Sequence, residues 1–286
     1  MFIKAINEIR GCVKPFVTSY KTPYNDELIS NMYPIIMIND EGWALTTKTV
    51  ASNIIIADKI HETYDKIKSE LIENKVPPKK IYKKYKLNED SPVILKNVFL
   101  DSVTSWEGLK IYAHDTLDLA LIKFENPEKI LCDKFPIFSS SVPQQGESLC
   151  KLCYPYYNIN VFRYDHISKD IVLNEIGLNG FQIMPIDGIM TRYLKENNEV
   201  SLFEMSGYSF NNNIGGPVIN KKGVIVGIQI NSVVEDAVID IETKLKRNLK
   251  EIEVKQYSFV PFSVCINSVE IMKFMNKYNI NYMKSK

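Results

Sequence analysis

The sequence predicts a mostly β fold of 286 residues, interrupted by a few helices. Short runs rich in Ile, Val, Tyr and Phe recur in both halves of the chain, and Gly, Pro, Asn and Asp bound them. Such runs are typical of the strands of a sandwich or barrel. We expect strands at residues 33–38, 53–57, 93–99, 110–112, 119–124, 147–153 and 224–230.

One long segment has helical periodicity instead. Residues 59–74 repeat apolar side chains at helical spacing among Glu and Lys, and Pro77 and Pro78 end the pattern. The run at residues 79–86 that follows is basic, with interleaved aromatic residues. We therefore predict a helical insertion over residues 59–86, between two expected strands. A charge run of this kind is usually a solvated face.

Two further helical segments are expected in the second half of the chain. Leu245 and Leu249 predict a helix near residues 242–251, before the last strand. Residues 267–278 carry apolar side chains at near-helical intervals and predict a helix after that strand.

The chain divides where strand patterns give way to turn residues. Residues 126–145 are punctuated by prolines and serines, which favours a boundary between two modules there. We expect one module over residues 1–130 and a second over residues 131–286, a length that allows a substantial core in each.

Composition excludes several classes of partner. The chain has 35 basic and 34 acidic residues, and a formal charge of +1 creates no long-range field for nucleic acid or an acidic membrane. Lys4, Glu8 and Arg10 break the apolar N-terminal run, so a signal peptide is not predicted and we expect a cytoplasmic protein. The five cysteines are predicted to be reduced and mostly buried: Cys12, Cys132, Cys150, Cys153 and Cys265.

Three short motifs occur in a fixed order. Residues 43–51 read Trp-Ala-Leu-Thr-Thr-Lys-Thr-Val-Ala after a turn, and residues 115–123 read Asp-Thr-Leu-Asp-Leu-Ala-Leu-Ile-Lys. Residues 213–217 read Asn-Ile-Gly-Gly-Pro within a strand-rich stretch. Gly-Gly-Pro alone is an ordinary turn signal, so the combination and its order carry the information.

These motifs resemble segments of trypsin-like serine proteases of the chymotrypsin superfamily, nearest to the HtrA-like branch. Residues 43–51 resemble the segment that delivers the catalytic histidine, with Thr49 in the histidine position. Asp118 occupies the position of the aspartate, and Ile214 stands where the nucleophilic serine precedes Gly-Gly-Pro. The three positions follow the order histidine, aspartate, serine of that superfamily.

The resemblance implies an all-β fold of two six-stranded antiparallel Greek-key barrels, with helical insertions and a C-terminal helix. Residues 146–155 resemble the strand that begins the second barrel, and residues 257–261 resemble its closing strand. The resemblance also implies an oxyanion loop at Asn212, Asn213, Gly215 and Gly216. Asn212 replaces the glycine that usually begins this loop.

The resemblance implies a protein that has lost its chemistry. Isoleucine has no atom that can attack a carbonyl, and threonine cannot replace the general base. We therefore expect a pseudoprotease whose cleft between the barrels binds a protein or peptide, with no cofactor and no metal. The Cys150 and Cys153 pair lacks a second ligand pair and lies on an expected strand, which argues against zinc.

Two alternatives remain open at this stage. An active serine peptidase could use a displaced nucleophile, Ser206 or Ser209, with His114 as its base. The chain could instead be a structural interaction module that docks through residues 59–86.

Overall fold

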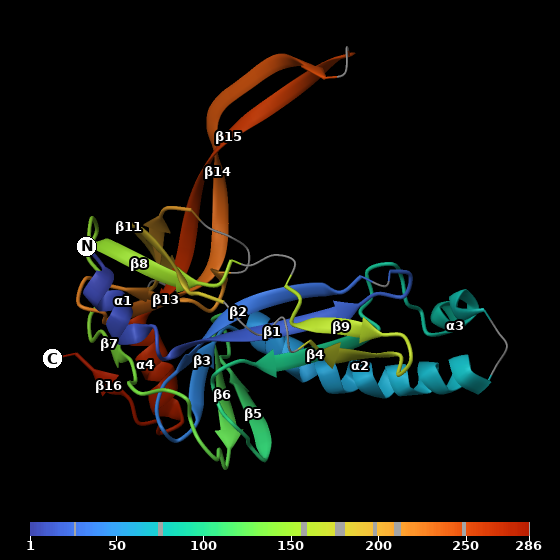
Figure 1. The fold of residues 1–286 in the computed structure, drawn as a ribbon. Helices are drawn as coiled ribbons and strands as arrows, with labels where there is room; N and C mark the ends of the chain where they lie inside the picture. The colour runs from blue at the N-terminus through green and yellow to red at the C-terminus, as the bar shows by residue number, and fades with distance from the viewer. Residues whose placement is uncertain are drawn as a thin grey trace.

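The computed structural model describes residues 1–25, 27–73, 77–155, 159–174, 181–196, 199–208, 213–247 and 250–285. Two large β-sheets form the framework of the fold, and Figure 1 shows the helices placed around them.

Six strands from the first half of the chain form the first sheet, in the order β4-β1-β2-β3-β6-β5. All five pairings are antiparallel. Their inward-facing residues are largely apolar, and Phe99, Trp106 and Phe124 pack edge to face. The strands are β1 (Val13–Lys21), β2 (Ile29–Met37), β3 (Trp43–Thr46), β4 (Ile94–Phe99), β5 (Gly108–Ala113) and β6 (Ala120–Glu125).

The first sheet does not close on itself through backbone hydrogen bonds. Among the strands described, no pairing joins β4 to β5. The helix α2 (Lys48–Glu73) packs against β4 and also touches β5 and β6, so it covers this side of the barrel. The short helix α3 (Pro78–Lys84) follows and packs on α2.

The helical insertion predicted at residues 59–86 is confirmed, but its helix begins earlier. The strand expected at residues 53–57 is wrong, because these residues lie inside α2. Ile54 packs on the core, while Ile55 and Ile56 are exposed on the outer face. The helical periodicity of the segment therefore prevails over the strand preference of three consecutive isoleucines. Each isoleucine lowers the stability of a helix by only about 0.5 kcal/mol relative to alanine.

The second sheet contains a closed ring of six strands, in the order β13-β8-β11-β12-β15-β14 with β14 paired back to β13. Two short strands, β7 and β16, extend it by parallel pairing. The strands are β7 (Ile137–Phe138), β8 (Ser148–Cys153), β11 (Met184–Glu196), β12 (Glu199–Ser206), β13 (Pro217–Ile219), β14 (Ile225–Arg247), β15 (Lys250–Asn267) and β16 (Met283–Lys284). A separate hairpin is formed by β9 (Phe162–Asp165) and β10 (Asp170–Leu173).

The chain forms two barrel-like sheets with six principal strands each, which follow one another in sequence and pack over a shared apolar core. This confirms the predicted fold class. The architecture is a double β-barrel. The prediction was incomplete in two respects: the first barrel stays open between β4 and β5, and β7 and β16 pair in parallel.

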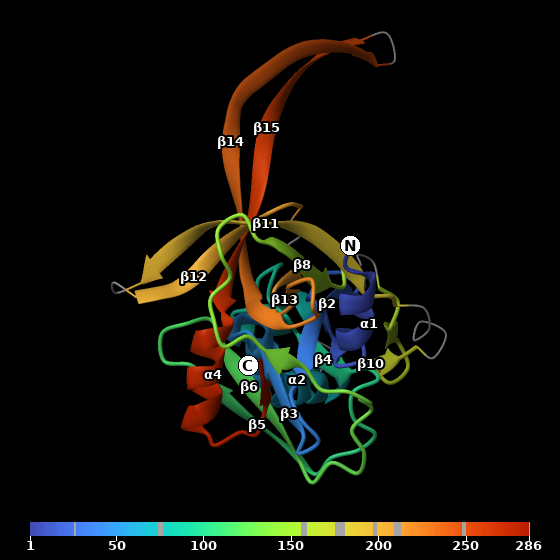
Figure 2. The ribbon, with the colours of Figure 1, turned by 90° about the vertical axis from the view of Figure 1, so that its left-hand side faces the viewer.

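The helix predicted near residues 242–251 is wrong. Residues 242–247 and 250–251 belong to β14 and β15, which pair in register from Asp240 opposite Tyr257 to Arg247 opposite Lys250. Figures 1 and 2 show this long hairpin projecting away from the rest of the molecule.

The helices at the two ends of the chain pack on the second barrel. The predicted terminal helix is confirmed as α4 (Ser268–Lys277), and the side chain of Asn267 caps it by accepting a hydrogen bond from the N–H of Glu270 at 3.0 Å. The helix α1 (Ile3–Ile9) lies near β8 and β13 in Figure 2. Across the part of the chain that is described, no helix is both long enough and apolar enough to span a membrane.

Candidate functional site

The first half of the site lies where α2 begins. Thr47 follows β3 directly, and its Oγ1 accepts a hydrogen bond from the N–H of Val50 at 3.2 Å, which caps the helix. Asp118 lies just before β6, the neighbour of β3 in the sheet. The N–H of Thr49 donates to Asp118 Oδ1 at 2.9 Å, and Thr49 Oγ1 donates to Oδ2 at 3.0 Å.

Both carboxylate oxygens of Asp118 are therefore used at the start of α2. The positions that the resemblance assigns to the histidine and the aspartate lie side by side, as a triad would require. In this chain the contact is a helix cap, because a carboxylate at a helix N-terminus also interacts favourably with the helix dipole.

The second half of the site is the tight turn at Asn213, Ile214, Gly215 and Gly216. The N–H of Gly215 donates to the carbonyl of Gln229 at 2.9 Å, and the N–H of Gln229 donates to the carbonyl of Gly216 at 2.9 Å. These bonds anchor the turn to β14 in the second barrel. Ile214 is half-buried and packs against the apolar core.

Gly215 places this turn beside the first half of the site. Its φ is +92°, and a Cβ there would lie 2.7 Å from the carbonyl oxygen of Pro34 and 3.0 Å from Thr46 Oγ1. The same position is 3.8 Å from Val50 Cγ2. Since Thr46 and Val50 flank Thr49 in sequence, the turn of the second barrel meets the start of α2, which only glycine permits at this distance.

Buried polar atoms without hydrogen bonds gather at this junction. The side chain of Asn213 is 1% exposed, and neither its Nδ2 nor its Oδ1 has a partner among the described residues. The same holds for Thr46 Oγ1 within that part of the chain. Each such atom lowers the stability of the fold by on the order of 1–3 kcal/mol, so the packing around the junction must offset this loss. Asn212, predicted to begin the oxyanion loop, lies outside the described residues.

The residues of the displaced-nucleophile alternative are engaged elsewhere. Ser206 Oγ accepts a hydrogen bond from the N–H of Ile189 at 3.0 Å, within the second barrel. His114 Nδ1 accepts from the backbone N–H groups of Thr116 and Leu117, at 3.2 and 3.1 Å. Burial lowers the pKa of His114, so the ring stays neutral and closes its own turn. Ser209 lies outside the described residues.

A buried lysine in the second barrel escaped sequence analysis. Lys151 on β8 is 1% exposed, its Nζ donates to Ser263 Oγ on β15, and burial lowers its pKa to about 8. Lys151 pairs with Val218, which follows the Gly-Gly-Pro turn. One signal could have revealed it: Lys151 interrupts the apolar run of β8 at a position that shares a face with Leu149 and Cys153.

The cysteines carry no activated thiol. All five are free, and four of them are buried. Burial raises the pKa of Cys150 to about 11 and that of Cys153 to about 12, which disfavours the reactive thiolate. No group of three or more His, Cys, Asp or Glu side chains gathers at one point within the described ranges.

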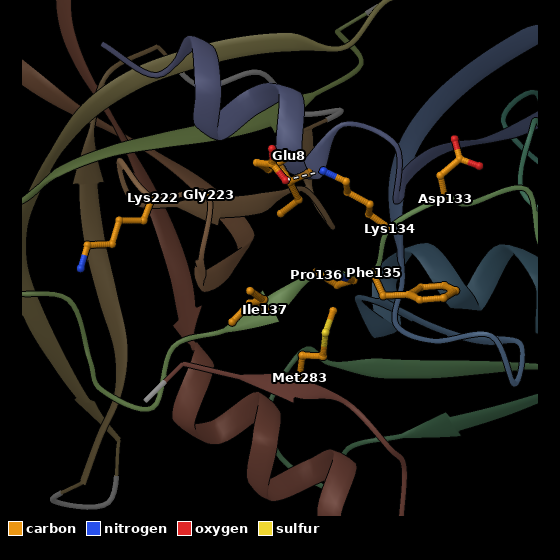
Figure 3. Close-up of a pocket in the computed structure, with 10 residues that line it drawn as sticks. Glu8, Asp133, Lys134, Phe135, Pro136, Ile137, Lys222, Gly223 and Met283 are labelled. Atoms are coloured by element: carbon orange, nitrogen blue, oxygen red, sulfur yellow. Dashed lines mark hydrogen bonds and ion pairs between the residues drawn. The ribbon is translucent and has the colours of Figure 1, made fainter.

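A cavity of about 490 Å³ lies on another part of the second barrel, near α1 and β7 (Figure 3). Glu8 and Lys134 form an ion pair of 2.8 Å at its wall, and Asp133 and Lys222 also line it. Because both signs of charge are present and partly paired, this cavity does not indicate one class of ligand.

Many solved structures are similar to this chain. No protein-family model matches the chain, and no curated protein matches it. Among solved structures, the chain is similar to "HtrA-type protease AlgWS227A with decapeptide", with 9% sequence identity and a TM-score of 0.48. That similarity covers 98% of this chain and 68% of the other.

Proposed function

We propose that this chain is a catalytically inactive protein of the trypsin-like fold that binds an extended peptide along its second barrel. The observation that carries the proposal is the pair of hydrogen bonds from Thr49 to the two carboxylate oxygens of Asp118. In a working triad the aspartate holds the imidazole that removes the proton of the nucleophile. Here a threonine takes that place and donates one hydrogen bond to each oxygen.

The nucleophile position supports the same conclusion. Ile214 has no nucleophilic atom, and its side chain packs against the core. Removing the nucleophile of a triad enzyme lowers turnover by a factor of about 10⁶, and removing the base as well adds little. The turn that carries Ile214 is nevertheless kept, with its backbone hydrogen bonds to β14.

The edge of β14 beside the turn supports peptide binding. Gln229 of β14 bonds to Gly215 and Gly216, and residues 231–234 further along β14 pair with β15 on one side. Among the described strands, none pairs with the other side of Asn231, Val233 and Val234. An extended peptide binds such an edge through main-chain hydrogen bonds.

The loss of activity is tested with a fluorophosphonate probe and with casein, using trypsin as the positive control. We expect no covalent label on this chain and no casein fragments. Labelling or cleavage that persists through repurification, and that disappears in the Ser206→Ala or Ser209→Ala variant, would show an active peptidase.

Peptide binding is tested with a library of synthetic decapeptides, captured on the immobilised protein and then measured singly. For a peptide that binds, hydrogen exchange at residues 230–234 should slow by about tenfold or more, because new main-chain hydrogen bonds protect these amides. Exchange in α4 serves as the internal reference. Protection confined to other elements, or no retained peptide at 100 µM, would contradict binding at this edge.

A further inference from the structure

A second cavity lies far along α2 from the Asp118 site. It has a volume of about 540 Å³, within the usual range for small-molecule sites of roughly 300–1,000 Å³. Four segments that are distant in sequence form its walls: the end of β1 with the turn after it, the second half of α2, the start of α3, and the β9–β10 hairpin.

Four tyrosines, one from each of these segments, line the cavity: Tyr24, Tyr64, Tyr82 and Tyr164. The rings of Tyr24 and Tyr82 are perpendicular, with centroids 5.8 Å apart. The ammonium of Lys21 lies over the ring of Tyr164, 5.0 Å from its centroid. Aromatic faces that converge in one cavity provide stacking surfaces for a planar ring.

The charges that line the cavity are all positive. Lys21, Lys79 and Lys169 contribute ammonium groups, and His166 lies at the wall with them. Lys21 is only 7% exposed and its Nζ donates to the carbonyl of Thr22 at 3.2 Å, so this cation is fixed in place.

No carboxylate lines the cavity among the described residues. Of the two nearby carboxylates, Asp170 pairs with Lys96 at 3.5 Å. Asp165 accepts hydrogen bonds from the hydroxyl and N–H of Ser168, at 2.7 and 3.2 Å, and is one negative charge against the three lysines. A chain with a formal charge of +1 therefore carries a local positive field at this cavity, which attracts anions.

The walls are held together before any ligand arrives. Tyr64 of α2 donates its hydroxyl to the carbonyl oxygen of Lys169 at 2.7 Å, which joins the helix to the β9–β10 hairpin. Burial raises the pKa of Tyr64, so the phenol keeps the proton that makes this bond. A preformed cavity loses less entropy on binding than one that must be assembled.

We propose that this cavity binds a mononucleotide-sized ligand, with a planar ring stacked among the tyrosines and a phosphate group in contact with the lysines. A phosphate dianion suits a cavity lined by three lysines, because charge-assisted hydrogen bonds are stronger than neutral ones. The size of the cavity and the single local patch favour a small ligand over a nucleic acid strand, which needs a continuous basic track. This site is independent of the function proposed above.

The test is calorimetric titration of the full chain with AMP, adenosine and inorganic phosphate. We expect AMP to bind saturably at one site per chain and to weaken as salt increases. Tyr82→Ala and Lys79→Ala should each weaken AMP binding by about tenfold, through loss of stacking and of one phosphate contact. Lys80→Ala is the matched control, because Lys80 lies on the same helix and is exposed outside the cavity.

Four results would overturn the proposal. They are no heat of binding at millimolar AMP, adenosine binding as tightly as AMP, inorganic phosphate binding as tightly as AMP, and a single-stranded oligonucleotide binding more tightly than AMP. Lys21→Met is a further variant; if it fails to fold, the exposed Lys79 still decides the role of charge. Circular dichroism on each variant separates lost binding from lost structure.

Discussion

The two barrels form their closed interiors in different ways. Backbone pairing joins all six principal strands of the second barrel into a ring, whereas α2 covers the first barrel on the side where β4 and β5 do not pair. The first barrel therefore supplies its half of the site from two places, Thr49 at the start of that covering helix and Asp118 just before β6. The second supplies a turn fixed to its own strands. The half of the site at Thr49 depends on the formation of α2, and the half at the Gly215 turn depends on the packing of the strands of the second barrel.

The largest loss of stability is expected from a substitution in the turn of the second barrel. Gly215→Ala forces a side chain into a backbone with φ of +92° and to within 2.7 Å of the carbonyl of Pro34. We expect a loss of about 3–4 kcal/mol in the free energy of unfolding, from the left-handed conformation plus the clash. Urea denaturation measures it. Gly146→Ala is the matched control, since its φ is +85° but no atom lies within 4 Å, and it should cost only about 1 kcal/mol. If the two variants lost equal amounts of stability, the contact between the Gly215 turn and Pro34 of the first barrel would contribute nothing to the loss.

The second-largest effect is expected in the interior of the second barrel, where a substitution should raise stability instead of lowering it. Lys151→Met removes a charge whose pKa falls from 10.5 to about 8 in the folded state. Between these values the unfolded chain binds more protons than the folded one, so the wild-type chain gains stability from this group as pH rises. Below pH 8 the variant should therefore be the more stable by about 2 kcal/mol, after allowing for the bond to Ser263 that is lost. The advantage should shrink between pH 8 and pH 10.5.

Guanidinium denaturation of both chains at pH 7 and at pH 9.5 checks this difference. Lys110→Met is the control, because Lys110 is exposed and pairs with Glu125. A variant that is less stable than wild type at pH 7, or whose advantage does not depend on pH, would show that burying the Lys151 ammonium does not destabilise the fold.

A smaller loss is expected from the half of the site in the first barrel. Asp118→Ala removes both hydrogen bonds from Thr49 and a negative charge at the start of α2, which should cost about 1–2 kcal/mol. Thermal unfolding measures the loss. Asp115→Ala, three residues earlier, removes a side chain that is 80% exposed and should change stability by less than about 0.5 kcal/mol. If Asp118→Ala were equally silent, the carboxylate would not be serving as a cap.

The smallest effect should come from shortening the projecting hairpin. Among the described residues, the strand pairs formed within 236–247 are with 250–259, and Figure 2 shows this part of the hairpin beyond the barrel. Replacing residues 236–259 with Asn-Gly should change the free energy of unfolding by less than about 1 kcal/mol, because an isolated two-stranded ribbon is itself only marginally stable. Denaturation of the shortened chain tests this, and a loss of several kcal/mol would make the hairpin part of the second barrel's cooperative unit.

The sequence predicted a mostly β fold because its strands are bounded by residues with strong turn preferences, and the resemblance of its motifs supplied the double barrel. Asp118 precedes a strand whose run, residues 119–124, matches β6 closely, and residues 147–153 match β8. The two site halves came from the same resemblance, and Gly215 and Gly216 mark a turn that tolerates no side chain.

The remaining features depend on contacts that are distant in sequence. The isoleucines of residues 53–57 favour a strand locally, yet α2 recruits them because Ile54 packs on the core. Near residues 242–251 the leucine spacing suggested a helix, while the partner strand that sets Lys244 opposite Glu253 lies nine residues further on in the chain. The burial of Lys151 likewise depends on Ser263, more than one hundred residues away.

One element connects the two sites assigned to this chain. Thr49 at the start of α2 contacts Asp118, and Tyr64 on the same helix lines the tyrosine cavity. At 1.5 Å per residue these two positions are about 22 Å apart along a continuous helix. A ligand that displaced α2 along its axis at the cavity would therefore also move Thr49 relative to Asp118.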